Sequence, residues 1–351
     1  MNNIANGLEG IIGHVPTIRL NRVHPVCTQQ DLFLKLEACN PGGSIKEKNA
    51  IYLVQDAIKS GKLKPGGTII EASSGNFGIG LAMVGAALGY KVIIVVDATI
   101  PPSIRRIISA HGTQLVEISF DQADIHGSMQ IARMKKANEL AQTIPGAWYA
   151  CQHLNPDNPL AHSEFTAKEI VNDFGGSAPD AIVIGVSTSG QLTGIGSFFR
   201  AHFPKTKLIA VDADGSAVFG TPRRSYKMTG MGLSFTPPQF NHDYIDEAYL
   251  VDDELSFSMC RIIASQEGLL LGASTGAIVA AGLSYACRQS TRQKILMINP
   301  DHGDRYLETI YNDEWMKKQK LKVLDKEQCA HIIEKLIPVD GSYFKPLAQS
   351  S

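Results

Sequence analysis

The sequence predicts an α/β protein built on parallel sheets, and two observations favour this class. Short runs rich in Val and Ile, without polar alternation, recur along the chain, as expected for strands buried on both faces. Longer segments of helical character separate these runs, and such alternation is typical of parallel sheets with helices on both faces. The length of 351 residues allows two domains.

The strand predictions follow the apolar runs, and the helix predictions follow the segments between them. Strands are expected at residues 32–36, 68–71, 91–96, 114–118, 147–150, 181–186, 207–212, 247–251 and 294–298. Helices are expected at residues 49–60, 78–88, 104–110, 127–142, 160–173, 191–202, 253–267 and 276–290. The turn-rich residues 155–159 (NPDNP) open a new block of the chain near residue 150. After residue 317 the chain becomes charged, and we expect a surface helix followed by a frayed end.

Composition excludes several function classes. The chain is 44% hydrophobic and 19% charged, with a net charge of −1, so nothing favours nucleic acid or a membrane surface as a partner. No apolar stretch reaches the roughly 20 residues that span a bilayer, and the start lacks the features of a signal peptide, so we expect a cytoplasmic protein. The sequence contains no C-x-x-C pair and no H-E-x-x-H motif, so we expect no catalytic metal.

A lysine, Lys46, follows a turn of Pro, Gly, Gly and Ser at residues 41–44. A desolvated lysine amine can lose its proton, attack a carbonyl carbon and form a Schiff base. The alternative is a solvated lysine at the start of a helix. The features that follow favour the reactive role.

Three loops rich in Gly and Ser come next along the chain, each before an expected helix. Residues 73–78 (SSGNFG) and 187–191 (STSGQ) follow apolar strands, so hydroxyls and backbone N–H groups would meet there at a helix N-terminus, which suits a carboxylate or a phosphate. A plain turn with a Ser N-cap is the alternative for residues 73–78. There is neither a Walker lysine nor a G-x-G-x-x-G motif, so nucleotide and NAD binding lose their usual support.

The third loop, residues 272–276 (GASTG), matches the G-x-S-x-G pattern of a serine hydrolase. Under that alternative Ser274 is the nucleophile, but Lys46 and the other two loops have no role. The candidate partners of Ser274 in this alternative are Asp301, Asp304, His302 and His331.

Taken together with residues 40–46 and 301–306 (DHGDRY), these loops resemble the pyridoxal-phosphate enzymes of the cysteine synthase and cystathionine β-synthase family (fold type II). The resemblance is collinear from about Gly10 to Trp315. It implies a tryptophan synthase β-like fold with two three-layer αβα domains and the cofactor in the cleft between them. The smaller domain would span residues 45–148, the larger would combine 1–44 with 149–316, and 317–351 would be a C-terminal extension.

The resemblance also implies roles for individual residues. Lys46 would carry pyridoxal 5′-phosphate, Asn76 would bond its hydroxyl group, and Ser274 would face its pyridine nitrogen. A hydroxyl beside the pyridine nitrogen, unlike a carboxylate, does not keep that nitrogen protonated. The cofactor is then a weaker electron sink, which suits β-elimination and limits transamination. The cofactor phosphate would lie on Ser187, Thr188, Ser189, Gly190 and Gln191. The substrate would lie on Ser73, Ser74, Asn76, Phe77 and Gln152, with Arg133 as a further candidate for a phosphate or carboxylate.

Two departures from the sulfhydrylases bear on the reaction. Phe77 stands where they carry Thr, and their phosphate loop is richer in glycine. Together with residues 211–216, 219–220, 303–306 and Trp315, these features resemble the siderophore-pathway branch, the N-(2-amino-2-carboxyethyl)-L-glutamate synthases. The reaction implied is replacement of the phosphate of O-phospho-L-serine by L-glutamate, toward 2,3-diaminopropionate.

The alternatives are a cysteine synthase that uses O-acetyl- or O-phosphoserine with sulfide, and a non-enzymatic module of the same fold. The module is disfavoured because Lys46 is present. Arg133 could instead be one of several solvated charges beside Lys135 and Lys136. Family members are usually homodimers, so a homodimer is expected.

Overall fold

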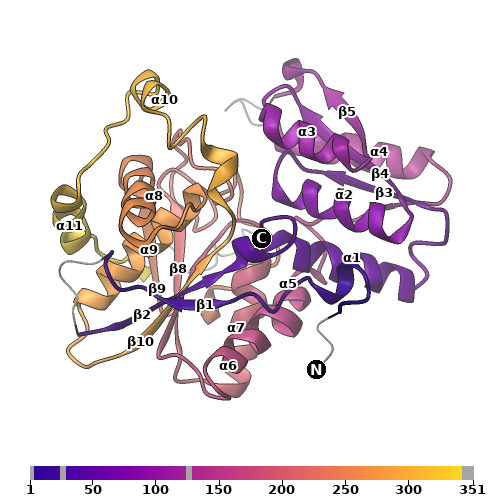
Figure 1. Cartoon of the computed structure of the whole chain (residues 1–351). Helices are drawn as coiled ribbons and strands as arrows, with labels where there is room; N and C mark the ends of the chain where they lie inside the picture. Colours follow the sequence, from indigo (N-terminus) through magenta and orange to yellow (C-terminus); the bar gives the residue numbers. More distant parts are fainter. Residues whose placement is uncertain (1–3, 24–28, 124–128, 342–351) are drawn as a thin grey trace, which may run out of the picture. The chain divides into compact units, whose positions relative to one another are not determined.

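The computed structural model describes residues 4–23, 29–123 and 129–341, and its chain forms two compact units (Figure 1). Unit 1 comprises residues 1–14 and 40–161, and unit 2 comprises residues 15–39 and 162–351. Unit 1 therefore contains the whole of the expected smaller domain, residues 45–148, together with flanking segments on both sides. The last ten residues of the expected C-terminal extension, 342–351, lie outside the described residues.

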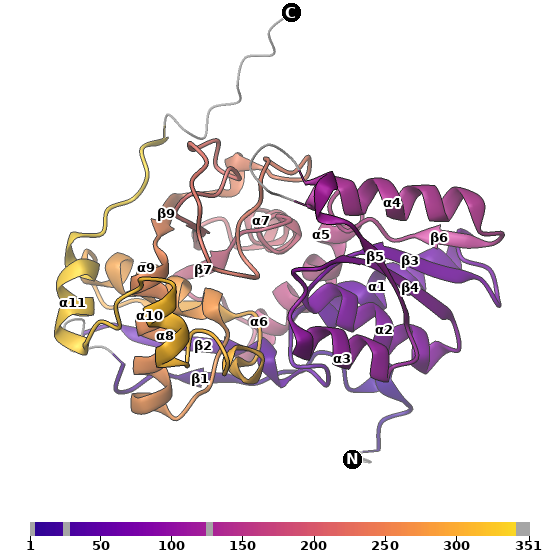
Figure 2. The same cartoon turned by 90° about the horizontal axis from the view of Figure 1, so that it is seen from above.

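Unit 1 is built on a parallel sheet that, in its described part, has four strands in the order β5-β4-β3-β6. Its strands are β3 (Thr68–Ala72), β4 (Lys91–Asp97), β5 (Gln114–Ile118) and β6 (Ala147–Tyr149). Its helices are α1 (Lys46–Lys59), α2 (Asn76–Leu88), α3 (Pro102–Ala110), α4 (Gln130–Thr143) and α5 (Asn158–Ala161). Figure 2 shows α4 on one side of these strands and α1, α2 and α3 on the other. The central strands β3 and β4 are buried on both faces, as their unbroken apolar runs predict, whereas the edge strands β5 and β6 are partly exposed.

Unit 2 is built on a six-stranded sheet, counted over the described residues, in the order β1-β2-β10-β7-β8-β9. Its strands are β1 (Thr17–Arg19), β2 (Asp31–Leu36), β7 (Ala181–Gly185), β8 (Lys207–Ala213), β9 (Glu247–Val251) and β10 (Lys294–Asn299). All neighbours are parallel except β1, which pairs antiparallel with β2 at the edge. Its helices are α6 (Lys168–Asp173), α7 (Gly190–His202), α8 (Asp253–Glu267), α9 (Ala273–Cys287), α10 (Asp313–Lys318) and α11 (Lys326–Lys335). The small side chains of α9 let it lie almost wholly buried against β7, β8 and α8.

The nine predicted strands and eight predicted helices are all present, with ends shifted by a few residues. The expected helix 127–142 begins at Gln130, and its first two residues lie outside the described part of the chain. The expected helix 160–173 is divided into α5, a π-helix at His162–Ala167, and α6. The buried ammonium of Lys35 in β2 lies 3.2 Å from Glu169 and 2.8 Å from Asp173, and so attaches α6 to the sheet.

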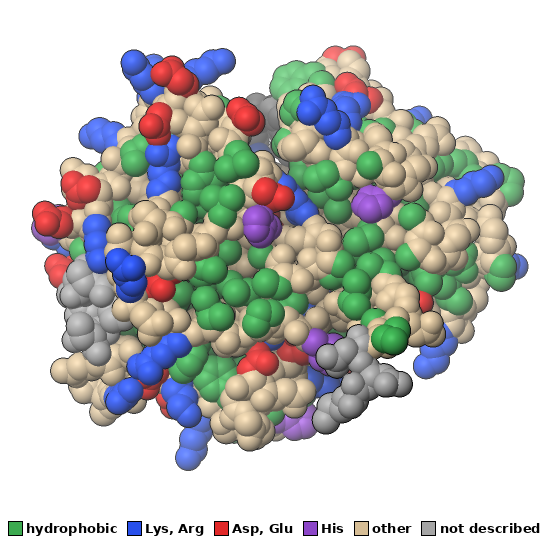
Figure 3. Space-filling view, viewed as in Figure 1, with side chains coloured by type: hydrophobic (Ala, Val, Ile, Leu, Met, Phe, Trp, Pro, Cys, Tyr) green, Lys and Arg blue, Asp and Glu red, His purple; other side chains and the backbone are tan. Residues whose placement is uncertain are grey.

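Elements absent from the prediction are short. Strand β1 has three residues, too few for a periodic pattern. The surface helix expected after residue 317 is α11, which begins with a capping box between Asp325 and Gln328 and packs on α8 and α9. None of the helices within the described ranges has the length and apolar character needed to span a bilayer. On the face drawn in Figure 3, cationic and anionic side chains are interspersed.

Candidate active site

Lys46 is the first residue of α1, and the turn before it is fixed by hydrogen bonds. The buried carboxylate of Glu47 accepts from Ser44 Oγ at 2.8 Å and from the Gly42 N–H at 3.2 Å. The Lys46 N–H donates to Ser44 Oγ at 3.3 Å. A preset backbone therefore holds the lysine, as its place after the turn predicts.

Helix α2 lies against the backbone of Lys46. A Cβ on Gly80 would come within 3.2 Å of the Lys46 carbonyl oxygen, so a glycine there allows the close approach of α1 and α2. Asn76 is the first residue of α2. The structure thus brings together the helices that begin with Lys46 and with Asn76.

The loop before α2 is held in place by the hydroxyl of Ser73. Ser73 Oγ accepts from the N–H of Gly78 at 3.1 Å and of Gly75 at 3.4 Å, so this hydroxyl supports the loop, as the plain-turn alternative expects. Asn76 is half-buried, and the Phe77 side chain is 2% exposed. Any substrate contact of residues 73 and 77 would therefore depend on their backbone groups.

Arg133, on α4, is not a solvated charge. Its guanidinium forms an ion pair with Asp97 at the end of β4 and donates to Ser74 Oγ at 2.9 Å. Its side chain is 15% exposed, and none of the described residues accepts a hydrogen bond from its buried Nε. A cation therefore stands directly beside the 73–78 loop.

Gln152 follows β6 and is buried near the same loop. Its N–H donates to the Glu71 carboxylate at 3.2 Å, and its carbonyl accepts from Asn158 Nδ2 at 2.6 Å. The next residue, His153, is also buried. Burial, and then the charges of Lys46 and Arg133, lower the pKa of His153 to about 3, so its imidazole is neutral at physiological pH.

In unit 2 the loop of residues 187–191 connects β7 to α7. Ser189 adopts a left-handed conformation (φ 66°) at the helix N-cap. Within the described chain, Ser189 Oγ and Gln191 Nε2 are buried and have no hydrogen-bond partner. Since a helix N-terminus also presents N–H groups without intrahelical acceptors, the loop has unused donors for an anion.

Ser274 is the second residue of α9 in unit 2, and its side chain is buried. Its Oγ finds no hydrogen-bond partner among the residues described. A Cβ on Gly230 would lie 3.8 Å from this oxygen, while Gly232 accepts from Ser187 Oγ at 3.4 Å and donates to the Val186 carbonyl at 3.0 Å. The segment 230–232 thus lies beside both Ser274 and the 187–191 loop.

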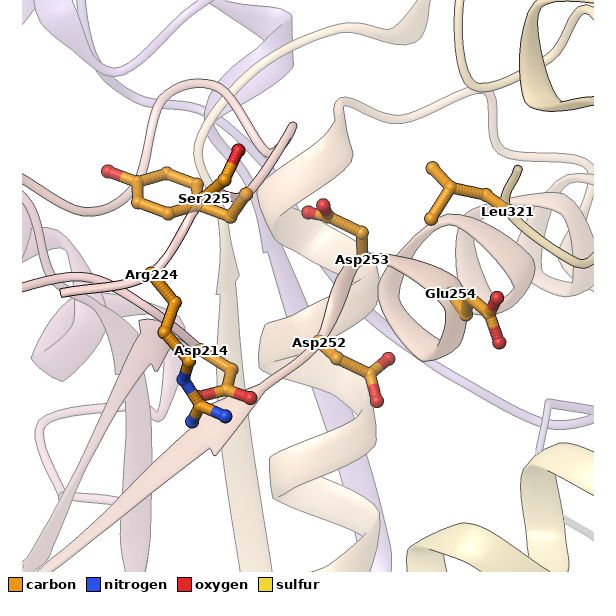
Figure 4. A pocket seen from close by; sticks show the side chains of 8 residues that line it. Asp214, Arg224, Ser225, Asp252, Asp253, Glu254 and Leu321 are labelled. Carbon is orange, nitrogen blue, oxygen red and sulfur yellow. The ribbon is translucent and has the colours of Figure 1, made fainter. Parts of the chain in front are cut away.

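A pocket of about 280 Å³ in unit 2 shows how the chain just before the segment 230–232 is anchored (Figure 4). Asp253, at the start of α8, accepts from the N–H groups of Lys227 at 2.6 Å and Met228 at 2.9 Å. Arg224 and Asp214, which also line this pocket, form an ion pair with each other. The carboxylates of this pocket are engaged by the chain itself, so we assign it a structural role.

The geometry does not support the hydrolase alternative. Ser274 lies inside a helix without the strained positive φ of a nucleophile elbow. Neither candidate base bonds to its Oγ: His302 accepts from the Asp304 N–H at 3.2 Å, and His331 contacts Lys335 at 2.8 Å. A serine nucleophile needs an adjacent base.

Comparison with known proteins decides the family. Residues 8–301 match the family model described as pyridoxal-phosphate dependent enzyme. The chain belongs to this family. Its fold is the type II fold of pyridoxal-phosphate enzymes, as the resemblance predicted.

Solved structures of this pyridoxal-phosphate family are similar to the chain over most of its length. An O-ureido-L-serine synthase is 35% identical, with a TM-score of 0.81, over 90% of this chain and 99% of that one. The O-acetyl serine sulfhydrylase isoform 3 from Entamoeba histolytica is 33% identical, with a TM-score of 0.84, over 95% and 97%. An O-acetylserine dependent cystathionine beta-synthase from Helicobacter pylori is 33% identical, with a TM-score of 0.81, over 88% and 99%.

The residues present fit pyridoxal phosphate. Three buried polar atoms that lack partners among the described residues, Ser189 Oγ, Gln191 Nε2 and Ser274 Oγ, fall on the positions expected for its phosphate and its pyridine nitrogen. Such atoms are costly to bury unless a ligand or water satisfies them. The ranges that the structure describes contain no group of three His, Cys, Asp or Glu side chains that could hold a metal ion.

Sequence reasoning missed several residues beside these candidates. Glu71, Asn158 and Asn49 support Gln152 and α1, but isolated Glu and Asn residues give no sequence signal. The segment 229–232 (TGMG) has two glycines with positive φ. Two glycines so close together are the sequence signal that could have marked this segment as a turn.

Proposed function

We propose that this pyridoxal-phosphate enzyme catalyses β-replacement on an activated L-serine. The observation that carries the proposal is the set of buried, unused donors and hydroxyls in unit 2, combined with a lysine held on a fixed turn in unit 1. When bound, pyridoxal phosphate supplies the electron sink that lets the β-substituent leave.

The roles of the protein residues follow from their chemistry. Lys46 would hold the cofactor and move the Cα proton of the substrate. Residues 187–191 would bind the cofactor phosphate with N–H and hydroxyl donors, Asn76 would bond its ring hydroxyl, and Ser274 would face its pyridine nitrogen. The substrate carboxylate would be bound by the 73–77 loop and by Gln152.

For the donor we propose O-phospho-L-serine, with phosphate as the leaving group. Arg133 supports this choice, because a half-buried guanidinium beside Ser74, with a buried Nε that no described residue engages, suits a phosphate. For the nucleophile we propose L-glutamate, which gives N-(2-amino-2-carboxyethyl)-L-glutamate, a precursor of 2,3-diaminopropionate. This choice rests on the sequence features shared with the siderophore-pathway branch. We also propose a cytoplasmic homodimer, as expected from the sequence.

A second candidate is cysteine synthesis from O-acetyl- or O-phosphoserine and sulfide. The similarity to the sulfhydrylase of Entamoeba histolytica specifically favours it. Both candidates begin with loss of the β-substituent from an activated L-serine. They differ in the nucleophile and, where O-acetylserine is the donor, also in the leaving group.

One experiment separates these candidates. Purified enzyme is mixed with O-phospho-L-serine or O-acetyl-L-serine, and with L-glutamate, sulfide or neither, and the products are identified by mass spectrometry. We expect phosphate release and a secondary amine with three carboxylates from O-phospho-L-serine and L-glutamate. Cysteine as the sole product would support the second candidate, and no product with any pair would contradict β-replacement.

A further inference from the structure

Glu71 is a fully buried carboxylate in unit 1 that the proposed chemistry leaves unused. It is the penultimate residue of β3, two positions before Ser73. Its Oε1 accepts from the Ala72 N–H at 2.9 Å, and its Oε2 accepts from the Gln152 N–H at 3.2 Å. One side chain thus connects the segment that leads into the 73–78 loop with the segment that carries Gln152.

The backbone after β6 is shaped for this contact. Cys151 adopts a left-handed conformation (φ 49°), which is uncommon for a residue with a side chain. The N–H of Gln152 donates to the Glu71 carboxylate at 3.2 Å, and the N–H of Cys151 acts on the same carboxylate to lower its pKa. Successive N–H groups around a left-handed residue form a concave anion site, and here a carboxylate of the chain itself fills it.

Gln152 is also held from its other side. Its carbonyl accepts from Asn158 Nδ2 at 2.6 Å, and Asn158 Oδ1 accepts from Asn49 Nδ2, also at 2.6 Å. Asn49 lies on α1, less than one turn after Lys46. A chain of hydrogen bonds therefore runs from Glu71 through Gln152 to the helix that begins with Lys46.

The charge of Glu71 is balanced against its burial. Burial raises its pKa to about 7, while the N–H groups of Ala72, Gln152 and Cys151 and the charge of Arg133 act in the opposite direction. The titratable groups at the end of β6 that act with it are the Tyr149 hydroxyl and the Cys151 thiol, whose pKa values are raised first by burial and then by Glu71. The carboxylate is therefore able to change its protonation near physiological pH.

We infer that Glu71 is a positioning residue for substrate binding: its carboxylate fixes Gln152 in register with the 73–78 loop and with α1. Because Gln152 is placed at the substrate carboxylate by the proposed function, this role rests on that function. Glu71 itself would not touch the substrate. Protonation of Glu71 replaces an acceptor by a donor that faces N–H groups, so substrate binding should weaken as the pH falls through about 7.

The test compares Glu71→Gln with the wild-type holoenzyme. The steady-state constants for O-phospho-L-serine, at saturating L-glutamate, are measured from pH 6 to 9. We expect KM to rise about tenfold with kcat within about twofold, since a hydrogen bond to a charged group is lost. The fall in affinity of the wild type below about pH 7 should be absent in the variant.

Hydrogen–deuterium exchange of the resting enzyme gives a readout that does not depend on turnover. The peptide that contains Cys151 and Gln152 should exchange faster in Glu71→Gln. The matched control is Glu117→Gln on β5 of the same sheet, whose exposed carboxylate pairs with Arg105 of α3; it should leave both measurements unchanged.

Two results would overturn the role of Glu71. In the first, Glu71→Gln folds and its peptide with Cys151 and Gln152 exchanges at the wild-type rate. In the second, that peptide exchanges faster but the KM does not change. If Glu71→Gln does not fold, the KM of Asn158→Asp is measured instead. This substitution removes the donor to the Gln152 carbonyl and keeps the acceptor for Asn49. A raised KM in that variant supports the network, and an unchanged KM refutes it. A wild-type enzyme that turns over no donor would instead defeat the proposed function, and the exchange data would still report on Glu71.

Discussion

Arg133 NH1 and Ser74 Oγ are joined by a hydrogen bond of 2.9 Å. The bond links α4 to the loop before α2, although the two residues are far apart in the sequence. The same guanidinium is paired with Asp97, which the N–H of Thr99 also bonds at 2.8 Å. The pair with Asp97 compensates the charge of Arg133, and the buried Nε of Arg133 remains a donor that no described residue engages beside this loop.

Arg133→Ala should reduce kcat/KM for O-phospho-L-serine by about 100-fold, because a charge-assisted contact to phosphate is lost. With O-acetyl-L-serine, which has a neutral leaving group, the loss should be much smaller. The ratio between the two donors is the deciding measurement, because it cancels general damage from leaving Asp97 unpaired. Lys136→Ala on the same helix, at an exposed pair with Glu139, is the control. Equal losses for both donors would show that Arg133 does not bind the phosphate.

Lys46 should carry the cofactor. Borohydride reduction of the purified enzyme should fix the cofactor mass on the peptide that contains Lys46, because reduction makes a lysine Schiff base permanent. Peptide mass spectrometry gives the answer directly. Lys46→Ala should lose this label, and Lys48→Ala, two residues away, keeps Lys46 and serves as the control if it folds. Labelling of a different lysine would contradict the role.

The sequence predicts the sheets of both units well, because strands buried on both faces require unbroken runs of Val and Ile such as residues 91–96. It predicts Lys46 and the three glycine loops as candidates because turn chemistry is local. It could not decide whether Arg133 is solvated, since its pairing with Asp97 and Ser74 depends on how β4 and α4 pack. It gave no indication of Glu71 or Asn158, because their bonds to Gln152 and Asn49 form only when the segments that carry these residues pack together.

Ser274→Ala should retain cofactor binding while most turnover is lost, because residues 187–191 still supply the phosphate donors. Cofactor occupancy is measured by absorbance, and turnover by phosphate release. Ser274→Asp should increase side reactions, since a carboxylate keeps the pyridine nitrogen protonated. A fluorophosphonate probe should not label Ser274, whose Oγ has no base bonded to it among the described residues. Stoichiometric labelling at Ser274 would restore the hydrolase alternative.

Asp212, buried at the end of β8, should make the protein less stable at higher pH. Burial raises its pKa to about 7, and no described residue donates a hydrogen bond to its Oδ2. Between about pH 4 and pH 7 the folded protein keeps this proton while the unfolded chain releases it, so the free energy of unfolding falls as the pH rises through that window. Asp212→Asn should therefore gain up to about 4 kcal/mol relative to the wild type at pH 8, with little difference at pH 4. Urea unfolding of both proteins at the two pH values measures this, and Asp214→Asn, at a partly exposed ion pair, is the control. An equal difference at both pH values would rule out the titration of Asp212.

The nucleophile should be L-glutamate rather than sulfide. Sulfide is small and can enter any open site, so cysteine formation alone does not decide the matter. The deciding quantity is the ratio of kcat/KM for the two nucleophiles, because specificity is a difference in transition-state binding. D-Glutamate and L-aspartate should react poorly, because their carboxylates would miss the donors placed for those of L-glutamate. A site built to hydrogen-bond a carboxylate discriminates against an analogue whose carboxylate lies elsewhere. Stopped-flow absorbance after O-phospho-L-serine alone should show a change that L-glutamate reverses. If sulfide reverses that change readily and L-glutamate does not, the enzyme is a cysteine synthase and the proposed nucleophile is wrong.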